Sequence, residues 1–73
     1  MLLCLSHAML LGLEYRMGAL LISLSVLEHW LEDNAGTVKD EVRVQRIRHW
    51  RGEVMEEIES TDMQLEAVRE ELE

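Results

Sequence analysis

Residues 10–31, LLGLEYRMGALLISLSVLEHWL, decide the fold of this chain. Within them, apolar side chains recur in alternating steps of three and four: Leu10, Leu13, Met17, Leu20, Leu24, Leu27 and Leu31. This heptad spacing places all seven side chains along one side of an α-helix. A long apolar seam of this kind needs a partner helix to cover it.

The surrounding sequence predicts two long helices joined by a short turn. We expect the first helix over residues 2–33, the turn over 34–37 and the second helix over 38–72. The chain has no proline, so the strongest helix breaker is absent. Two long helices with a short connection form an antiparallel hairpin, so the expected fold is a single all-α domain.

Capping residues mark the break between the two helices. Asn34 or Gly36 can supply a left-handed cap at the end of the first helix. Thr37 and Asp40 then form a pattern that resembles the capping box at the start of a helix, with Asp in the usual Glu position.

The second helix carries a matching seam with one irregular step. Its members are Ile47, Trp50, Val54, Ile58, Thr61, Leu65, Val68 and Leu72. Two successive steps of four, ending at Ile58, form a stutter that locally unwinds a left-handed coiled coil. A second cap-like pattern, Thr61-x-x-Gln64, follows directly. A kink near Ser60, or a short third helix, is therefore an open alternative.

The first helix has a second apolar stripe, roughly opposite the leucine seam. We predict an oligomer interface there, made of Leu11, Tyr15, Gly18, Ile22, Val26 and Trp30. Each of these large side chains that stays in water loses about 1.5–3 kcal/mol of the stabilisation that its burial would give. A two-helix chain of 73 residues with one cysteine cannot form an internal disulfide and is marginal alone. We expect a homodimer with a four-helix-bundle, coiled-coil-like core, or a higher helical oligomer.

The net charge of −8 favours basic partners over nucleic acid. One basic cluster nevertheless exists, and we regard it as a candidate partner-binding segment: Arg43, Arg46, Arg48 and Arg51. Residues 53–73 hold nine acidic side chains and one arginine. We expect the cluster to pair with these acids within or between subunits. Binding of an acidic protein, or of nucleic acid by a dimer, is a weaker alternative.

A membrane-associated protein, with the N-terminal third of the chain in lipid and the acidic second helix outside, is a second alternative. The uninterrupted apolar run Met17–Leu27 has eleven residues, fewer than the roughly 20 that span a bilayer. A longer span would place Glu14 and Arg16 near its centre. The free-energy cost of inserting each charged side chain there is about 2.5–3.5 kcal/mol. No basic segment or A-x-A-like cleavage site accompanies the apolar N-terminal residues. We expect a cytoplasmic protein.

No arrangement of residues predicts catalysis, a metal or a cofactor. Glu53-x-x-Glu56-Glu57 resembles the paired glutamates of helical nucleotide pyrophosphatases, but the later Glu-x-x-Asp is missing, since Arg69 stands at that offset from Glu66. The three histidines are scattered, without metal-ligand spacing. The sequence therefore predicts a small non-enzymatic interaction or scaffold module that self-associates through its first helix.

Overall fold

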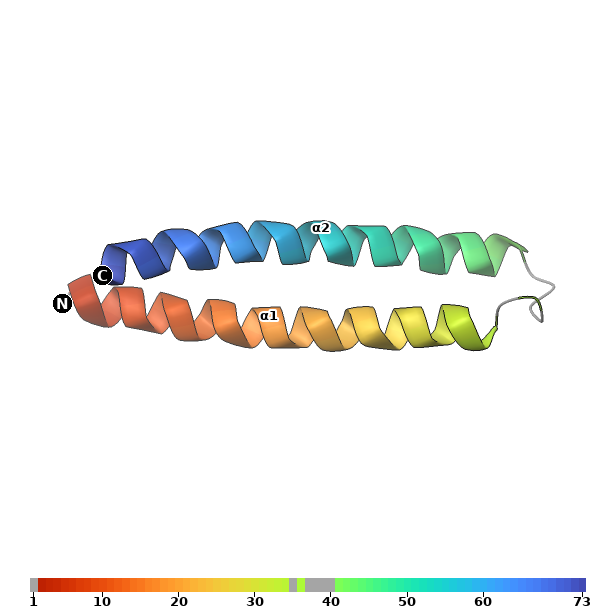
Figure 1. The fold of residues 1–73 in the computed structure, drawn as a ribbon, viewed down its shortest axis with the longest axis horizontal. Helices are drawn as coiled ribbons and strands as arrows, with labels where there is room; N and C mark the ends of the chain where they lie inside the picture. The colour runs from red at the N-terminus through yellow and green to blue at the C-terminus, as the bar shows by residue number, and fades with distance from the viewer. Residues whose placement is uncertain (1, 35, 37–40) are drawn as a thin grey trace.

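The computed structural model of the chain is a hairpin of two long α-helices (Figure 1). It describes residues 2–34, 36 and 41–73, with side chains from Leu5 onward. Helix α1 covers Leu2–Asp33 and helix α2 covers Glu41–Leu72. The two helices are antiparallel, so both chain termini lie at one end and the turn at the other (Figure 1). The expected all-α hairpin is confirmed, whereas assembly into an oligomer stays a prediction.

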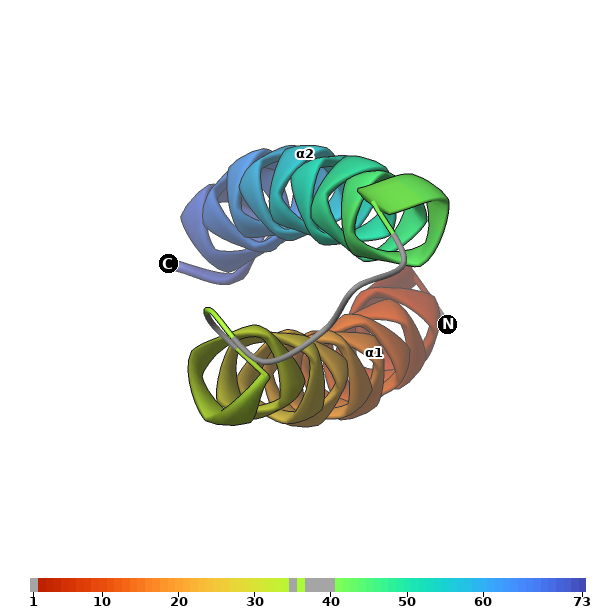
Figure 2. The same cartoon turned by 90° about the vertical axis from the view of Figure 1, so that its right-hand side faces the viewer.

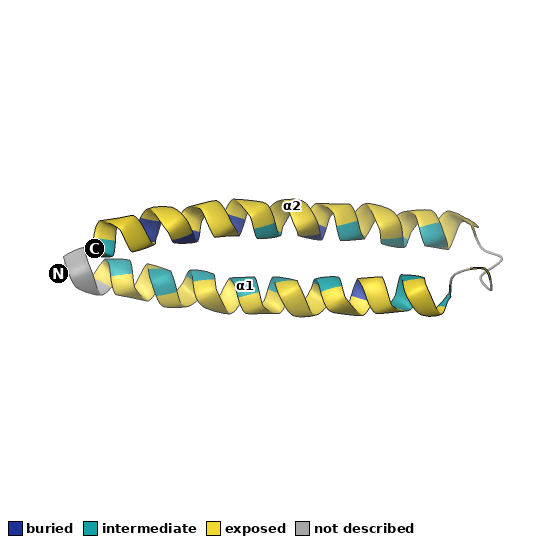
Figure 3. Cartoon of the chain, viewed as in Figure 1, coloured by how far each residue is buried: buried dark blue, intermediate teal, exposed yellow. Residues whose placement is uncertain are grey.

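The leucine seam of α1 is its contact surface with α2. All seven predicted positions from Leu10 to Leu31 are half-buried or buried, and Leu27 is only 6% exposed. The same 3–4 spacing extends to Ser6 at one end and Asn34 at the other, both half-buried. The buried and half-buried residues of the two helices lie on facing sides (Figure 3).

The seam of α2 differs from the expected one in two respects: it begins one step earlier, at Val44, and it contains Arg51 in place of Trp50. Its half-buried and buried members are Val44, Ile47, Arg51, Val54, Ile58, Thr61, Leu65, Val68 and Leu72. These steps alternate between three and four throughout, so the expected stutter is absent from the described residues of α2. Trp50 is 55% exposed, and its predicted place in the hairpin core is wrong.

Helical geometry explains the exchange of Trp50 for Arg51. The closely packed run from Val54 to Leu72 fixes which side of α2 faces α1. Extending the same spacing backwards reaches Arg51, whereas Trp50 is rotated away by about 100°. An arginine tolerates a seam position because its aliphatic stem can pack while its guanidinium reaches water.

Helix α2 runs without interruption through Ser60, from Glu41 to Leu72. Thr61 is only 1% exposed, the lowest value among the buried residues of the hairpin. It packs in the interhelical seam and does not begin a new helix. The alternative of a break near Ser60 is therefore wrong.

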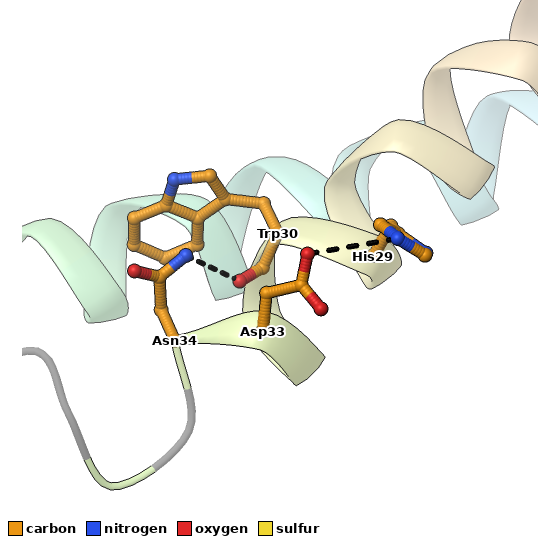
Figure 4. Close-up of polar contacts among 4 residues, drawn as sticks. All are labelled: His29, Trp30, Asp33 and Asn34. Carbon is orange, nitrogen blue, oxygen red and sulfur yellow. Dashed lines mark hydrogen bonds and ion pairs between the residues drawn. The ribbon is translucent and has the colours of Figure 1, made fainter.

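Asn34 caps the C-terminal end of α1. Its backbone N–H donates to the carbonyl of Trp30 at 3.0 Å, and its side-chain Nδ2 donates to the same oxygen at 2.8 Å (Figure 4). Gly36 follows with φ +78°, so of the two candidates glycine takes the left-handed conformation. The capping box expected at Thr37 and Asp40 lies outside the described residues.

The hairpin is a thin rod measuring 55 × 15 × 14 Å. Seen end-on, the two helices lie side by side and each presents one face to the other (Figure 2). Two helices can make only one contact layer, so each helix keeps an outer side that points away from its neighbour. The character of these outer sides decides what the hairpin can bind.

Candidate functional site

The outer side of α1 is apolar and exposed. We call its central stripe the outer face, and it consists of Leu11, Tyr15, Gly18, Ile22 and Val26. All five lie in water, and the four large side chains are between 62% and 82% exposed. Exposed apolar surface of this extent on one helix is typical of an interaction site. The structure thus brings five of the six predicted interface residues onto one exposed face.

Apolar residues also flank the outer face. Leu5, Met9 and Leu21 are each at least half exposed, and none of them belongs to the stripe expected as the interface. Only two charged side chains occur between residues 5 and 27, namely Glu14 and Arg16. The apolar surface of α1 is therefore wider than the stripe that heptad counting singled out.

The sixth predicted interface residue, Trp30, lies at the edge of this surface. It is half-buried near the turn, where it lines a hollow of about 730 Å³ with Leu31, Val44 and Arg51. Its position resembles that of a seam residue more than that of Leu11 or Ile22. Its part in an oligomer interface stays a prediction.

An apolar groove lies between the helices at the end that carries the termini. Its volume is about 560 Å³, and its lining residues are Met9, Gly12, Leu13, Arg16, Gln64, Ala67, Val68 and Glu71. A Cβ atom on Gly12 would meet nothing within 4 Å, so this part of the groove is open. On the helical wheel Gly12 lies between the outer face and the inner seam, so the groove continues the outer face sideways.

The four arginines of the predicted basic cluster do not share one face. Arg43, Arg46 and Arg48 are exposed and Arg51 is half-buried, because their spacing distributes them around α2. Arg48 and Arg51 line the hollow near the turn, but three carboxylates, those of Glu28, Glu32 and Glu41, line it as well. A bound phosphate would meet those carboxylates, so the hollow is poorly suited to anions.

Charged side chains approach one another between the helices and within each helix. Arg16 Nη2 lies 3.7 Å from Glu57 Oε2 and joins α1 to α2. His29 and Asp33 approach to 3.6 Å within α1 (Figure 4), and His49 and Glu53 to 2.8 Å within α2. Each histidine pair is exposed, and its two partners lie one helical turn apart on the same helix. This is a local helix-stabilising arrangement and not a reactive site.

Metal-binding chemistry requires several ligands that converge. Within residues 2–34, 36 and 41–73, no group of three or more His, Cys, Asp or Glu side chains could hold a metal ion. The acidic side chains of α2 project along and around a single helix. They have the arrangement of a solvated surface.

Helix α1 is long and apolar enough to cross a membrane. An 18-residue stretch within Leu5–Asp33 reaches a mean hydropathy of 1.5, and only 6% of that stretch is buried in the hairpin. This segment is longer than the uninterrupted run Met17–Leu27 and includes Glu14 and Arg16, the two charged residues expected near the centre of a longer span. Core helices of soluble proteins and N-terminal signal sequences share this length and composition.

The candidate site is thus a surface, formed by the outer face of α1 and the adjoining groove. Nothing about it depends on a reactive group. Searches with this chain find no matching protein-family model, no matching curated protein and no matching solved structure.

Proposed function

We propose that this protein is a small, non-enzymatic, cytoplasmic interaction module that self-associates through the outer face of α1. The observation that carries the proposal is the exposure of Leu11, Tyr15, Ile22 and Val26 on a helix whose opposite side already packs on α2. A helix that is apolar on two opposite sides is suited to burial on both. Helix α2 covers one side, and a second copy of the chain would cover the other.

The size of the hydrophobic term supports this reading. Burial of four large apolar side chains is worth roughly 6–12 kcal/mol per chain before entropic costs, at about 1.5–3 kcal/mol each. A whole small domain has a net stability of about 5–15 kcal/mol. The contribution available from the outer face is therefore comparable with the total stability that the hairpin could have alone.

The spacing of the outer face suits a second copy of α1. Leu11, Tyr15, Gly18 and Ile22 follow one another in steps of four, three and four, the spacing by which two helices pack side chains into each other's gaps. Gly18 adds a position where the second helix can approach closely, since a Cβ there would meet nothing within 4 Å. A two-fold dimer uses the same patch on both subunits, and this stripe is complementary to itself.

Insertion of α1 into lipid is the second candidate function. It is favoured by the length and hydropathy of Leu5–Asp33. It has a large cost, because α2 carries 14 charged side chains among its 32 residues and cannot follow α1 into a bilayer. The helices would separate and expose Val54, Leu65 and Val68, which are only 3–6% exposed in the hairpin. We therefore rank self-association first.

Sedimentation equilibrium of the purified chain at micromolar concentration tests the proposal. We expect a mass at least twice the 8.5 kDa of one chain. Ile22→Glu places a charge in the centre of the outer face and should shift the protein towards monomer. Met63→Glu is the matched control, because Met63 is equally exposed but lies on α2, away from the outer face. A monomeric wild-type chain, or equal effects of the two substitutions, would contradict the proposal.

Vesicle flotation separates the two candidates. The chain is mixed with phosphatidylcholine vesicles without detergent and centrifuged through a density gradient. Self-association in water predicts that the protein stays in the dense fraction. Insertion of α1 predicts that it floats with the lipid, and that Ile22→Glu reduces flotation.

A further inference from the structure

The exposed side of α1 carries a complete second seam. Steps of three and four that start at Leu5 reach only exposed residues that are apolar or glycine: Leu5, Ala8, Gly12, Tyr15, Ala19, Ile22 and Val26. The spacing equals that of the leucine seam but lies on the roughly opposite side of the helix. We call these seven residues the second seam. It shares Tyr15, Ile22 and Val26 with the outer face, and Leu11 and Gly18 lie beside it.

Large and small side chains follow one another along the second seam in a particular order. From Ala8 to Val26 the order is small, small, large, small, large, large, where the large residues are Tyr15, Ile22 and Val26. Reading this order backwards and exchanging large for small gives the same order again. The seam is therefore complementary in size to its own reverse, about a centre level with residue 17.

We infer that the second seam is the contact between two copies of the chain, with Tyr15 of each copy packed against Ala19 of the other and Ile22 against Gly12. The inference rests on the proposed self-association and names the residues that meet in it. Val26 then lies against Ala8, so each layer of the contact joins one large residue with one small one. The two copies of α1 run antiparallel in the middle of a row of four helices, and the two copies of α2 lie on the outside.

Other alignments of the two seams pack poorly. A parallel alignment sets each residue against its own copy, so that Tyr15 meets Tyr15 while Gly12 meets Gly12. An antiparallel alignment shifted by one heptad sets Leu5 against Ile22 and Ala8 against Ala19. In both cases crowded layers alternate with voids, whereas the contacts of folded proteins are close-packed.

The charges of α1 itself favour the same pairing. Glu32 and Asp33 lie at the turn end of α1, whereas no acidic side chain occurs before Glu14. Packed helices lie about 8–10 Å apart, which is close to the Debye length of about 8 Å at physiological ionic strength, so charges on two adjacent copies of α1 still interact. A parallel pair would bring the two copies of Glu32 and Asp33 together. In the inferred pairing each acidic end lies beside the end of the other α1 that has no acids.

The apolar surface of this side is large enough for a dimer. Its five large residues, each between 62% and 82% exposed, are Leu5, Leu11, Tyr15, Ile22 and Val26. Burial removes about 60–120 Å² of apolar surface per large side chain, so two chains together supply about 600–1,200 Å². The small residues of the second seam add to this area. A specific interface needs about 1,000 Å² in total, which the second seam can therefore provide.

Cross-linking between single cysteines tests which residues meet. The background is Cys4→Ser, which removes the single natural cysteine. Ala8→Cys or Val26→Cys is then introduced, since both positions are exposed and cysteine behaves there as a small apolar residue. Each variant alone, and a mixture of the two, is treated with a short bis-maleimide and separated on a denaturing gel. Mass spectrometry of the linked peptides identifies the residues joined.

The inferred pairing predicts covalent dimers in the mixture, joined through residues 8 and 26, and none in either variant alone. Two copies of residue 8 would lie about 27 Å apart along the helices, at about 1.5 Å per residue, beyond the reach of the reagent. Dimers of each variant alone would show a parallel pair and overturn the inference. Absence of cross-links from all three samples would also overturn it if sedimentation equilibrium still shows a dimer. A monomeric wild-type chain in that measurement would instead overturn the proposed function itself.

Charge compensation provides a second readout. Ile22→Glu should shift the chain towards monomer, and adding Gly12→Lys to the same chain should shift the mass back towards dimer, because each lysine then lies against a glutamate of the other copy. A Cβ atom on Gly12 or on Gly52 would meet nothing within 4 Å, so lysine at either position leaves the hairpin intact. Ile22→Glu with Gly52→Lys is the matched control, since it makes the same change of charge on α2, and it should stay monomeric. Equal masses for the two double variants would show that residue 12 does not face residue 22 and would overturn the inferred pairing.

Discussion

Arg16 of α1 and Glu57 of α2 form an ion pair between the helices, with 3.7 Å between Nη2 and Oε2. Both side chains are more than half exposed, so water screens their attraction. Arg16 is nevertheless the one arginine or lysine between residues 5 and 27 of α1, and it lines the groove beside α2 and not the outer face. The pair therefore leaves the outer face free of positive charge.

We expect Arg16→Gln to lower the free energy of unfolding by less than about 1 kcal/mol, as for other exposed pairs. Urea denaturation followed by circular dichroism measures this change. The substitution should leave the oligomeric mass unchanged, because it alters the groove side of α1 and not the outer face. A loss of several kcal/mol would mean that the pair is shielded from water, in conflict with its exposure.

Replacement of Arg51 by leucine should stabilise the hairpin. Arg51 is half-buried in the seam of α2. All the other residues of this seam are apolar except Thr61. A leucine there would add apolar contact with α1, worth about 1–2 kcal/mol. Arg48→Leu is the matched control, because Arg48 is exposed one turn away and its replacement should change stability by less than about 0.5 kcal/mol. Equal urea midpoints for the two variants would contradict the assignment of Arg51 to the seam.

Arg51 also shows how far the sequence alone predicts this fold. The seam of α1 was predictable in full, since leucine or methionine occupies every position from Leu10 to Leu31. In α2, hydrophobicity favoured Trp50 over its neighbour Arg51, and the apparent stutter followed from that choice. Strict 3–4 counting back from Val54 would have reached Arg51, because packing geometry and not residue type decides which side chain faces the partner helix.

The outer face was predictable for a different reason. Leu11, Tyr15, Ile22 and Val26 lie opposite the seam, and helical periodicity alone places them there. The groove was not predictable, since its lining includes two small residues, Gly12 and Ala67, that are far apart in the sequence and come to one groove only in the folded hairpin. Pairings between helices depend on their register, which no single helix encodes.

Two truncations to alanine should separate folding of the hairpin from association. Leu65 is 3% exposed in the seam, so Leu65→Ala should lower the free energy of unfolding by about 2–5 kcal/mol. Ile22→Ala removes an exposed side chain and should weaken association, with a concentration-dependent loss of thermal stability. Circular dichroism melts over a series of protein concentrations measure both effects. If Ile22→Ala lowers stability equally at every concentration, Ile22 contributes to the hairpin itself and not to an interface.

Glycine-to-alanine substitution should have opposite effects at two positions. Gly36 has φ +78°, a conformation that alanine adopts with strain, so Gly36→Ala should destabilise the hairpin by about 1 kcal/mol. Gly52 lies inside α2, where a Cβ would meet nothing within 4 Å. Gly52→Ala should therefore stabilise the hairpin by about 0.5–1 kcal/mol, the ordinary cost of glycine in a helix. The two urea midpoints should move in opposite directions from the wild type. A midpoint that does not fall for Gly36→Ala would mean that the turn can be rebuilt without a left-handed residue, and the Asn34–Trp30 hydrogen bonds alone would then end α1.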